Sequence, residues 1–316
     1  MTPAAPAVRI DAVTVFYGEV VGLSQVSLEL SPGIVGIVGP NGSGKTTLMR
    51  VLVGLLQPRE GHVQVLGGSP FADAEVRAQI TLVPASENFY PNLSGRKNLE
   101  VAFLAQGLPR AEARARAELG LERIGLVADG PRHYGTWSRG MRQRLKLGLA
   151  LANDSPVVLL DEPFLGVDPP NRHALREHIL ALGNAGKVVL VSSHILHEIE
   201  ALTDRVGVLA NGRLLGFGRL DQLLSELRDD HPHRIRLRVD APRPLAVELL
   251  SLEHVRELRI LGEDSLEFTT VKPDEAYRDL PAVVVRTGAV VRDVRSDDHS
   301  LENVFREVTA SGSRRL

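Results

Sequence analysis

The first 224 residues alternate short runs of apolar, β-branched residues with segments of helical period. Strands are predicted at Val8–Phe16, Gln25–Leu30, Ile34–Val38, Val157–Leu160 and Val188–Ser192. A helix is predicted from Lys45 to Val53, and Gly54 ends its pattern. Because strands that alternate with helices favour a largely parallel sheet covered by those helices, the sequence predicts an α/β fold for this part.

The pattern changes near residue 228. Arg234–Val239 alternates strictly between charged and apolar residues, as a half-buried strand does. The elements expected after it are a helix at Leu245–Leu252, strands at Val255–Ile260 and Leu266–Val271, another helix, a strand at Ala289–Val294 and an amphipathic helix at Ser300–Val308. The order β-α-β-β-α-β is typical of a small α+β domain with ferredoxin-like connectivity. We therefore expect one domain over residues 1–228 and a second over residues 229–316.

The composition is that of an ordinary globular protein, with 43% hydrophobic and 24% charged residues. The net charge of −2 carries no basic footprint for nucleic acid. Cysteine is absent, which excludes disulfides, thiolate catalysis and cysteine-ligated metals. No apolar run approaches the ~20 residues that span a bilayer, and the N-terminus shows no signal-peptide pattern. We expect a soluble chain that reaches a membrane only through a partner.

A glycine-rich segment lies between the predicted strand Ile34–Val38 and the predicted helix. It matches the phosphate-binding pattern G-x-x-x-x-G-K-[ST] and consists of Gly39, Pro40, Asn41, Gly42, Ser43, Gly44, Lys45, Thr46 and Thr47. Glycines let backbone N–H groups approach phosphate closely, and the helix N-terminus adds its dipole. Lys45 is placed to reach the β- and γ-phosphates, and Thr46 to ligate Mg²⁺. A chance match is expected in roughly one such chain in a hundred, and the strand–loop–helix context makes it rarer.

Two adjacent carboxylates end the apolar strand Val157–Leu160. Asp161 is placed to hold Mg²⁺ through water, and Glu162 to polarise an attacking water. By itself, Asp-Glu-Pro after a strand is more often a helix cap with Pro163 in the first turn. With a phosphate-binding loop upstream, we favour the metal and general-base interpretation.

A third motif, Trp137–Arg144, lies between these two and reads Trp-Ser-Arg-Gly-Met-Arg-Gln-Arg. It resembles the signature L-S-G-G-Q of ATP-binding cassette (ABC) ATPases: Ser138 and Gly140 match, whereas the tryptophan, Arg139 and Met141 depart from it. The form S-x-G-M-x-Q-R is similar to that of ATP-binding subunits of ABC-2-type exporters. In the family this segment binds the γ-phosphate of an ATP held by the opposite subunit.

The physical chemistry of this motif suits that role. Ser138 offers a hydroxyl, and the helix that begins at Gly140 offers free N–H groups, both of which suit an anion. Ser138 is equally well placed as an ordinary N-cap of the basic helix Met141–Ala152. The two interpretations are compatible, because the same residue that caps the helix would also bind the anion.

The resemblance implies three further site residues. Asp168 occupies the place of the D-loop aspartate that links two ATP sites, and His194 that of the switch histidine on the γ-phosphate. Tyr17 resembles the aromatic residue that stacks on adenine, although it would also suit a strand end in a turn with Gly18. His194 and His197 could be misread as a zinc pair, but their order differs from H-E-x-x-H and no third ligand is evident.

One position departs from the family in a way that bears on catalysis. Ala85 stands where the family places a glutamine whose amide contacts Mg²⁺ and the attacking water. Ser86 or Glu87 could substitute through a shifted loop or a water, and the sequence leaves this open. We expect hydrolysis to survive, with slow turnover or altered coupling to the membrane partner as the risk.

The resemblance covers residues 8–225 as a nucleotide-binding domain with a helical subdomain at about 86–155. It covers residues 229–309 more weakly, as an accessory domain. It implies a P-loop ABC fold with an antiparallel β subdomain, binding of ATP and Mg²⁺, and ATP hydrolysis. It further implies a second ATPase subunit, most simply an identical one, and a transmembrane permease contacted through Glu87–Leu104. The chain would lie on the cytoplasmic face of the membrane through that permease.

Two other function classes fit less well. Soluble ABC ATPases that act on ribosomes or nucleic acid usually carry two cassettes or a long coiled-coil insertion, and this chain shows one phosphate loop and no sustained heptads. No nucleic-acid partner is therefore expected. A P-loop kinase or GTPase is disfavoured by the signature segment and by the lack of an N-K-x-D motif.

Overall fold

The computed structural model describes residues 7–86, 89–223 and 233–296. The chain divides into two compact units, Met1–Leu220 and Asp221–Leu316. The boundary expected at residue 228 and the helix expected at Ser300–Val308 both lie outside the described residues.

A six-stranded sheet forms the centre of the first unit. Its order is β5-β6-β7-β3-β8-β9. The strands are β3 (Gly33–Val38), β5 (Ile80–Val83), β6 (Val157–Asp161), β7 (Val188–Ser193), β8 (Arg205–Ala210) and β9 (Arg213–Arg219). The first five strands in this order are parallel and β9 is antiparallel. The carboxyl ends of β3, β6 and β7 therefore meet at one edge, where open α/β sheets place their ligands.

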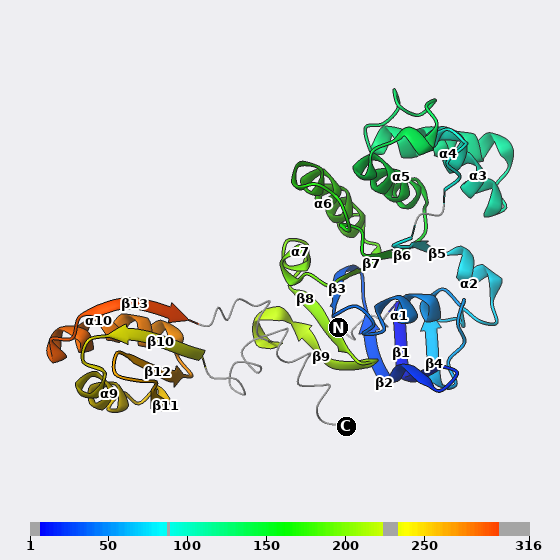
Figure 1. Cartoon of the computed structure of the whole chain (residues 1–316). Helices are drawn as coiled ribbons and strands as arrows, with labels where there is room; N and C mark the ends of the chain where they lie inside the picture. Colours follow the sequence, from blue (N-terminus) through cyan, green and yellow to red (C-terminus); the bar gives the residue numbers. More distant parts are fainter. Residues whose placement is uncertain (1–6, 87–88, 224–232, 297–316) are drawn as a thin grey trace. The chain divides into compact units, whose positions relative to one another are not determined.

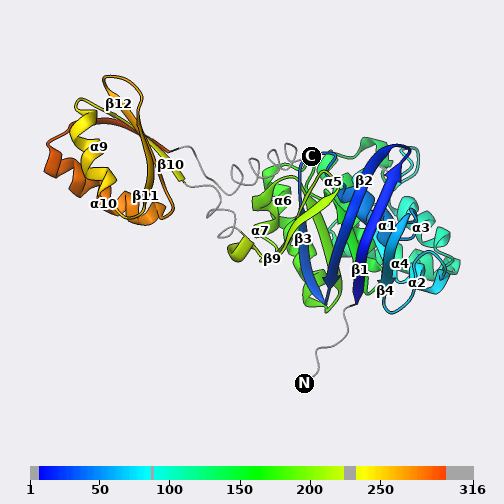
Figure 2. The ribbon, with the colours of Figure 1, turned by 90° about the horizontal axis from the view of Figure 1, so that it is seen from below.

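A second, antiparallel sheet lies beside the first (Figures 1 and 2). It contains β1 (Val8–Tyr17), β2 (Val20–Leu30) and β4 (Glu60–Val65) in the order β2-β1-β4. Helix α1 (Lys45–Leu52) packs against both sheets, and its buried side chains join apolar residues of β1, β2, β3, β6 and β7 in one core. The phosphate-binding loop is thus anchored on a helix whose apolar side chains are buried.

Strand β2 is longer than predicted, because it begins at Val20 rather than Gln25. Gln25 has a positive φ of 53°, and the pairing register between β1 and β2 shifts in this region. This irregularity interrupts the two-residue period, so the sequence pattern reveals only the second half of the strand.

The helices of the first unit fall into two sets. Helices α3 (Gly95–Ala105), α4 (Arg110–Arg123) and α5 (Arg139–Ala152) pack on one another and form a separate group near the β5 edge (Figure 1). Besides α1, the remaining helical elements described in this unit are α2 (Ala74–Ala78), α6 (Pro169–Asn184), α7 (Leu196–Glu200) and the 3-10 turn η1 (Tyr134–Thr136). Helix α5 contacts β5 and α6, so it connects the helical group to the sheet.

The second unit is a small α+β domain. Its elements are β10 (His233–Val239), α9 (Pro242–Leu250), β11 (Val255–Ile260), β12 (Ser265–Thr270), α10 (Pro273–Thr287) and β13 (Val291–Ser296). The sheet order is β11-β12-β10-β13, with all neighbours antiparallel. Both helices lie on one side of the sheet (Figure 2), where their apolar residues pack on Ile235, Leu237 and Phe268.

Candidate functional site

The phosphate-binding loop runs from the end of β3 to the start of α1. Gly44 caps α1 in the left-handed region with a φ of 109°, and a Cβ there would lie 2.7 Å from the carbonyl oxygen of Gly22. A Cβ at Gly39 would overlap the Leu209 carbonyl. These positions therefore need glycine. Pro40, Asn41 and Gly42 form the exposed tip of the loop.

The loop contains groups that suit a phosphate ligand. Ser43 Oγ is buried and has no hydrogen-bond partner within the described part of the chain. Lys45 is also buried, and its ammonium donates to the carbonyl oxygens of Gly39 (2.7 Å) and Pro40 (3.2 Å). An anion in the loop would offer both groups an oxygen, and burial strengthens such charge-assisted bonds.

Asp161 links the loop to the neighbouring strands. Its carboxylate accepts a hydrogen bond from Thr46 Oγ1 at 2.8 Å and one from Ser192 Oγ at 2.7 Å. The helix-cap interpretation is not what the structure has, because the next helix, α6, begins at Pro169 with Asp168 as its N-cap. Hydroxyl and carboxylate oxygens are the hard donors that Mg²⁺ prefers, so Thr46 and Asp161 fit this metal.

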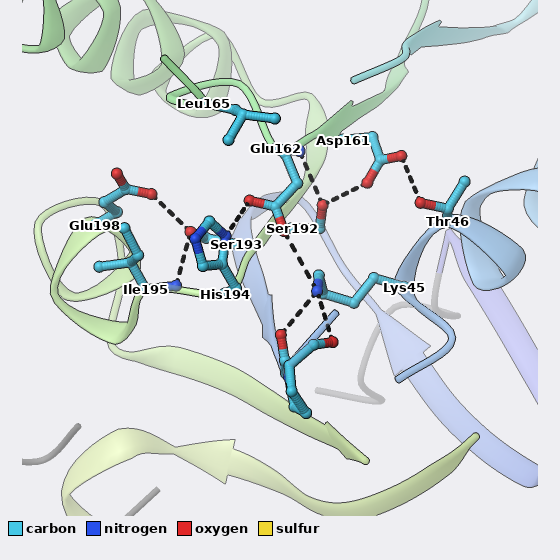
Figure 3. A network of polar contacts seen from close by, with 12 residues as sticks. Lys45, Thr46, Asp161, Glu162, Leu165, Ser192, Ser193, His194, Ile195 and Glu198 are labelled. Carbon is cyan, nitrogen blue, oxygen red and sulfur yellow. Dashed lines mark hydrogen bonds and ion pairs between the residues drawn. The ribbon is translucent and has the colours of Figure 1, made fainter. Parts of the chain in front are cut away.

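Glu162 lies between the ammonium of Lys45 and the ring of His194 (Figure 3). Its Oε1 is 3.3 Å from Lys45 Nζ, and its Oε2 is 2.9 Å from His194 Nδ1. The backbone of Glu162 has a φ of 49°, which is strained for a residue with a Cβ. Its N–H donates to Ser192 Oγ at 2.9 Å, and this bond supports the strained conformation.

A second layer of contacts holds the turn that carries His194. Ser193 Oγ donates to Glu198 Oε2 at 2.6 Å and accepts from the N–H of Ile195 at 3.1 Å. Glu198 is buried and also forms an ion pair with Arg172 at 3.1 Å. The carboxylate of Glu198, the residue that follows His197 in the sequence, thus takes part in structural contacts.

The signature residues form a second group of contacts. Ser138 caps α5 by accepting a bond from the N–H of Met141 at 3.3 Å. A Cβ at Gly140 would lie 3.3 Å from Asp168 Oδ1, and Asn171 donates to that same oxygen at 2.7 Å. The start of α5 therefore packs directly on Asp168 and Asn171 of the same chain.

Two departures from the family signature have structural reasons. Trp137 is buried, and its ring lies so close to Gly95 that a Cβ there would overlap it. Arg139 lies against Gly166, which has a φ of 70° and no room for a Cβ beneath the guanidinium. Both side chains therefore take part in packing between segments distant in sequence.

Tyr17 ends β1 next to the loop helix. Its hydroxyl is 3.3 Å from Thr47 Oγ1, and its side chain is half-exposed. Gly18, which follows, has a φ of 62° and begins the turn into β2. An exposed ring beside the phosphate-binding loop suits stacking on a base.

Ala85 lies beside the same site. A cavity of about 400 Å³ is lined by Thr46, Asp161, Ala85 and Ser86, together with Met49, Arg50, Leu55, Leu82 and Pro84. Ala85 thus lines the same cavity as Thr46 and Asp161.

Sequence reasoning missed two residues at the site. Ser192 joins Asp161 to the backbone of Glu162, and two polar residues at the end of an apolar strand were its only signal. Lys146 is buried and donates to the carbonyls of Pro84 and Ala85. The sequence places it in a basic helix, which favours a solvated side chain.

Along the described residues, no helix is both long and apolar enough to cross a bilayer.

Comparisons with known proteins bear on the family of this chain. Residues 23–165 match the family model described as "ABC transporter". The chain is 33% identical to a daunorubicin resistance ATP-binding protein, DrrA3, of Streptomyces coeruleorubidus, over 98% of this chain and 97% of that protein. It is 34% identical to a Nod factor export ATP-binding protein I of Paraburkholderia xenovorans (strain LB400), over 81% of this chain and 84% of that protein.

A solved structure is similar as well. It is an ATP-binding cassette in a dimeric, post-hydrolysis state bound to ADP and Pi, with a TM-score of 0.61 and 26% identity. The match covers 67% of this chain and 98% of that one. These comparisons confirm the expected α/β P-loop fold and the expected nucleotide binding and ATPase activity. The small α+β addition is confirmed by the elements of the second unit itself. This chain belongs to the ABC transporter family, as one of its ATP-binding and ATP-hydrolysing subunits.

Proposed function

We propose that this chain energises export through a separate, membrane-embedded permease and lies on the cytoplasmic face of the membrane through that permease. Relatives named for daunorubicin resistance and for Nod factor export support this direction of transport. The expected contact segment, 87–104, includes all of α3 except its last residue, and residues 87 and 88 lie outside the described part. An apolar cavity of about 250 Å³ between β5 and α3, lined in part by Phe89 and Tyr90, supports docking there.

One observation carries the assignment of the catalytic residues. Asp161 and Glu162 lie at the end of β6, His194 follows β7, and Lys45 begins the helix after the neighbouring strand β3. Together these residues form one connected set of contacts (Figure 3). Such a set places a cation for phosphate, oxygen ligands for a metal and a carboxylate for water within one site.

We assign the roles as follows. Lys45 and the backbone of the phosphate-binding loop would bind the β- and γ-phosphates. Thr46 and Asp161 would hold Mg²⁺, which when bound neutralises phosphate charge. Glu162 would accept a proton from the attacking water, and His194 would orient Glu162 and contact the γ-phosphate.

The remaining site residues would complete the nucleotide site. Tyr17 would stack on adenine. Ser138 and Gly140 would bind the γ-phosphate of the ATP held by a second copy of this chain, and Asp168 would link the two sites. The dimeric state of the similar cassette supports such an arrangement. Closure on ATP and opening after hydrolysis would then drive the permease.

We assign this activity to a domain over residues 1–228, with a helical subdomain at about 86–155, and treat residues 229–316 as an accessory domain. The separate apolar cores of the two units support this division.

ATP-driven dimerisation of the Glu162→Gln variant tests the proposal. This variant should bind ATP without hydrolysing it, and light scattering after size exclusion should show a dimer with ATP and a monomer without it. Adding Ser138→Arg should abolish the dimer while leaving nucleotide binding to the single chain intact. A monomer at saturating ATP would contradict pairing of two identical chains.

A second measurement tests the membrane partner. Turnover of ATP by the wild-type chain should rise when a permease is reconstituted with it in lipid, and should not respond to added RNA or DNA. Stimulation by nucleic acid alone would contradict the export assignment.

A further inference from the structure

Lys146 is an unusually placed cation. It lies in the middle of α5, and only 5% of its surface is exposed. Lysine is rarely buried to this degree. Its ammonium donates to the carbonyl oxygens of Pro84 at 3.2 Å and of Ala85 at 3.0 Å. The signature helix therefore holds the loop that follows β5 by charge-assisted bonds.

That loop forms a wall between two cavities. The first, which we call the inner cavity, has a volume of about 400 Å³ and is lined in part by Thr46 and Asp161. The second, the outer cavity, has a volume of about 250 Å³ and is lined in part by Lys146 itself. Leu82 and Pro84 line both of them. The position of the wall thus determines the shape of the metal side of the nucleotide site.

Ala85 makes this backbone attachment more important. A methyl group can neither donate nor accept a hydrogen bond, so at this position the loop is held by its carbonyl and not by its side chain. Removal of the ammonium would take a donor from two carbonyls at once. A partly buried carbonyl that loses its donor takes another partner, so the loop would move.

We propose that Lys146 is a positioning residue for ATP hydrolysis: it fixes the loop between the two cavities and so connects the signature helix and the outer cavity to the metal side of the nucleotide site. The proposal rests on the function proposed above. Lys146 does not touch the reacting atoms; it acts through the backbone of Pro84 and Ala85. Because α5 begins next to Ser138 and carries Lys146 two turns later, movement of the helix at either end reaches this loop.

The test replaces Lys146 with methionine in the full chain. Methionine keeps most of the side-chain volume but has no donor. For Lys146→Met we expect kcat to fall about tenfold, as for a site group that is slightly misplaced. The Mg²⁺ concentration for half-maximal activity should rise severalfold, whereas ATP binding measured in EDTA should stay unchanged. A merely structural role would lower thermal stability without moving the Mg²⁺ dependence.

Lys187→Met is the matched control. Lys187 is half-buried, donates to the carbonyl of Asn153 at 2.7 Å, and precedes β7 at the end opposite to His194. The Lys187→Met variant loses the same kind of hydrogen bond, but away from the nucleotide site. Its kcat and its Mg²⁺ dependence should therefore remain those of the wild type. If Lys146→Met behaves like this control, the proposal is wrong.

Lys146→Arg decides the case if the methionine variant does not fold. The adjoining outer cavity leaves room for the guanidinium, which keeps donors for both carbonyls. A folded arginine variant should retain kcat within about threefold. A folded but inactive arginine variant would overturn the proposal. If the wild type itself shows no MgATP turnover, the proposed function fails instead.

Discussion

Strand β7 ends in two adjacent serines that provide an internal comparison. Both residues have no exposed surface. Ser192 donates to Asp161 at 2.7 Å and accepts from the N–H of Glu162 at 2.9 Å. Ser193, on the other side of the strand, donates to Glu198 at 2.6 Å and accepts from the N–H of Ile195 at 3.1 Å. Each hydroxyl thus serves one carboxylate and one backbone N–H.

Replacing either serine with alanine should cost similar folding free energy. Each change removes one hydrogen bond to a carboxylate and leaves one backbone N–H without its partner. From the usual value of such losses, we expect the free energy of unfolding to fall by about 2–4 kcal/mol for each variant. Urea denaturation followed by circular dichroism measures this loss.

The two variants should differ in catalysis. Ser192 supports the strained backbone of Glu162 and the orientation of Asp161, so Ser192→Ala should lower kcat by about tenfold to a hundredfold. Ser193→Ala leaves these contacts intact and loosens only the turn that carries His194, so it should lower kcat less than Ser192→Ala does. The assay is steady-state phosphate release at saturating MgATP, at a temperature where both variants are folded. Equal kcat values for the two variants would refute the reasoning.

Two further predictions concern the core and the pH dependence of stability. A Cβ at Gly36 would overlap the side chain of Ile199, so Gly36→Ala should lower the free energy of unfolding by about 1–3 kcal/mol, measured by urea denaturation; an unchanged midpoint would contradict the packing described. Burial, and then the nearby guanidinium of Arg144, lower the pKa of His178 below 6.5. The unfolded chain therefore binds this proton more readily, and the stability that the neutral ring contributes is present above pH 6.5 and lost as the pH falls below it. His178→Gln should reduce the fall in melting temperature between about pH 7.5 and pH 5.5, and an identical fall in both proteins would exclude this contribution.

The nucleotide-binding part of the site is readable from the sequence because it depends on local pattern. Lys45, Asp161 and His194 each follow an apolar run, and parallel strands bring their carboxyl ends together. The same reasoning gives the general course of the second unit, whose first strand, β10, alternates between exposed and buried residues. The observed strand ends differ from the predicted ones by a few residues, because hydrogen bonding and not the apolar pattern defines where a strand ends.

Other features depend on three-dimensional packing that no local pattern encodes. Lys146 lies in a helix with several basic residues. Its side chain is buried because the loop after β5 packs against it and accepts its hydrogen bonds. The bond from Ser192 to Asp161 requires that β6 and β7 be neighbours in register. The contact of Arg139 with Gly166 likewise joins a signature residue to a turn beyond β6.

The central claim, that each ATP site is built from two copies of this chain, is tested most directly by mixing two defective variants. Lys45→Ala damages the phosphate-binding loop, and Ser138→Arg blocks the signature that serves the opposite site. Each variant alone forms only defective sites, whereas a mixed dimer contains one site with both motifs intact. We predict that each variant alone is inactive and that an equal mixture recovers a substantial part of the wild-type rate, at most about half, because each mixed dimer has one working site. A mixture that stays inactive, although both variants are folded and the wild type turns over ATP, would contradict the account.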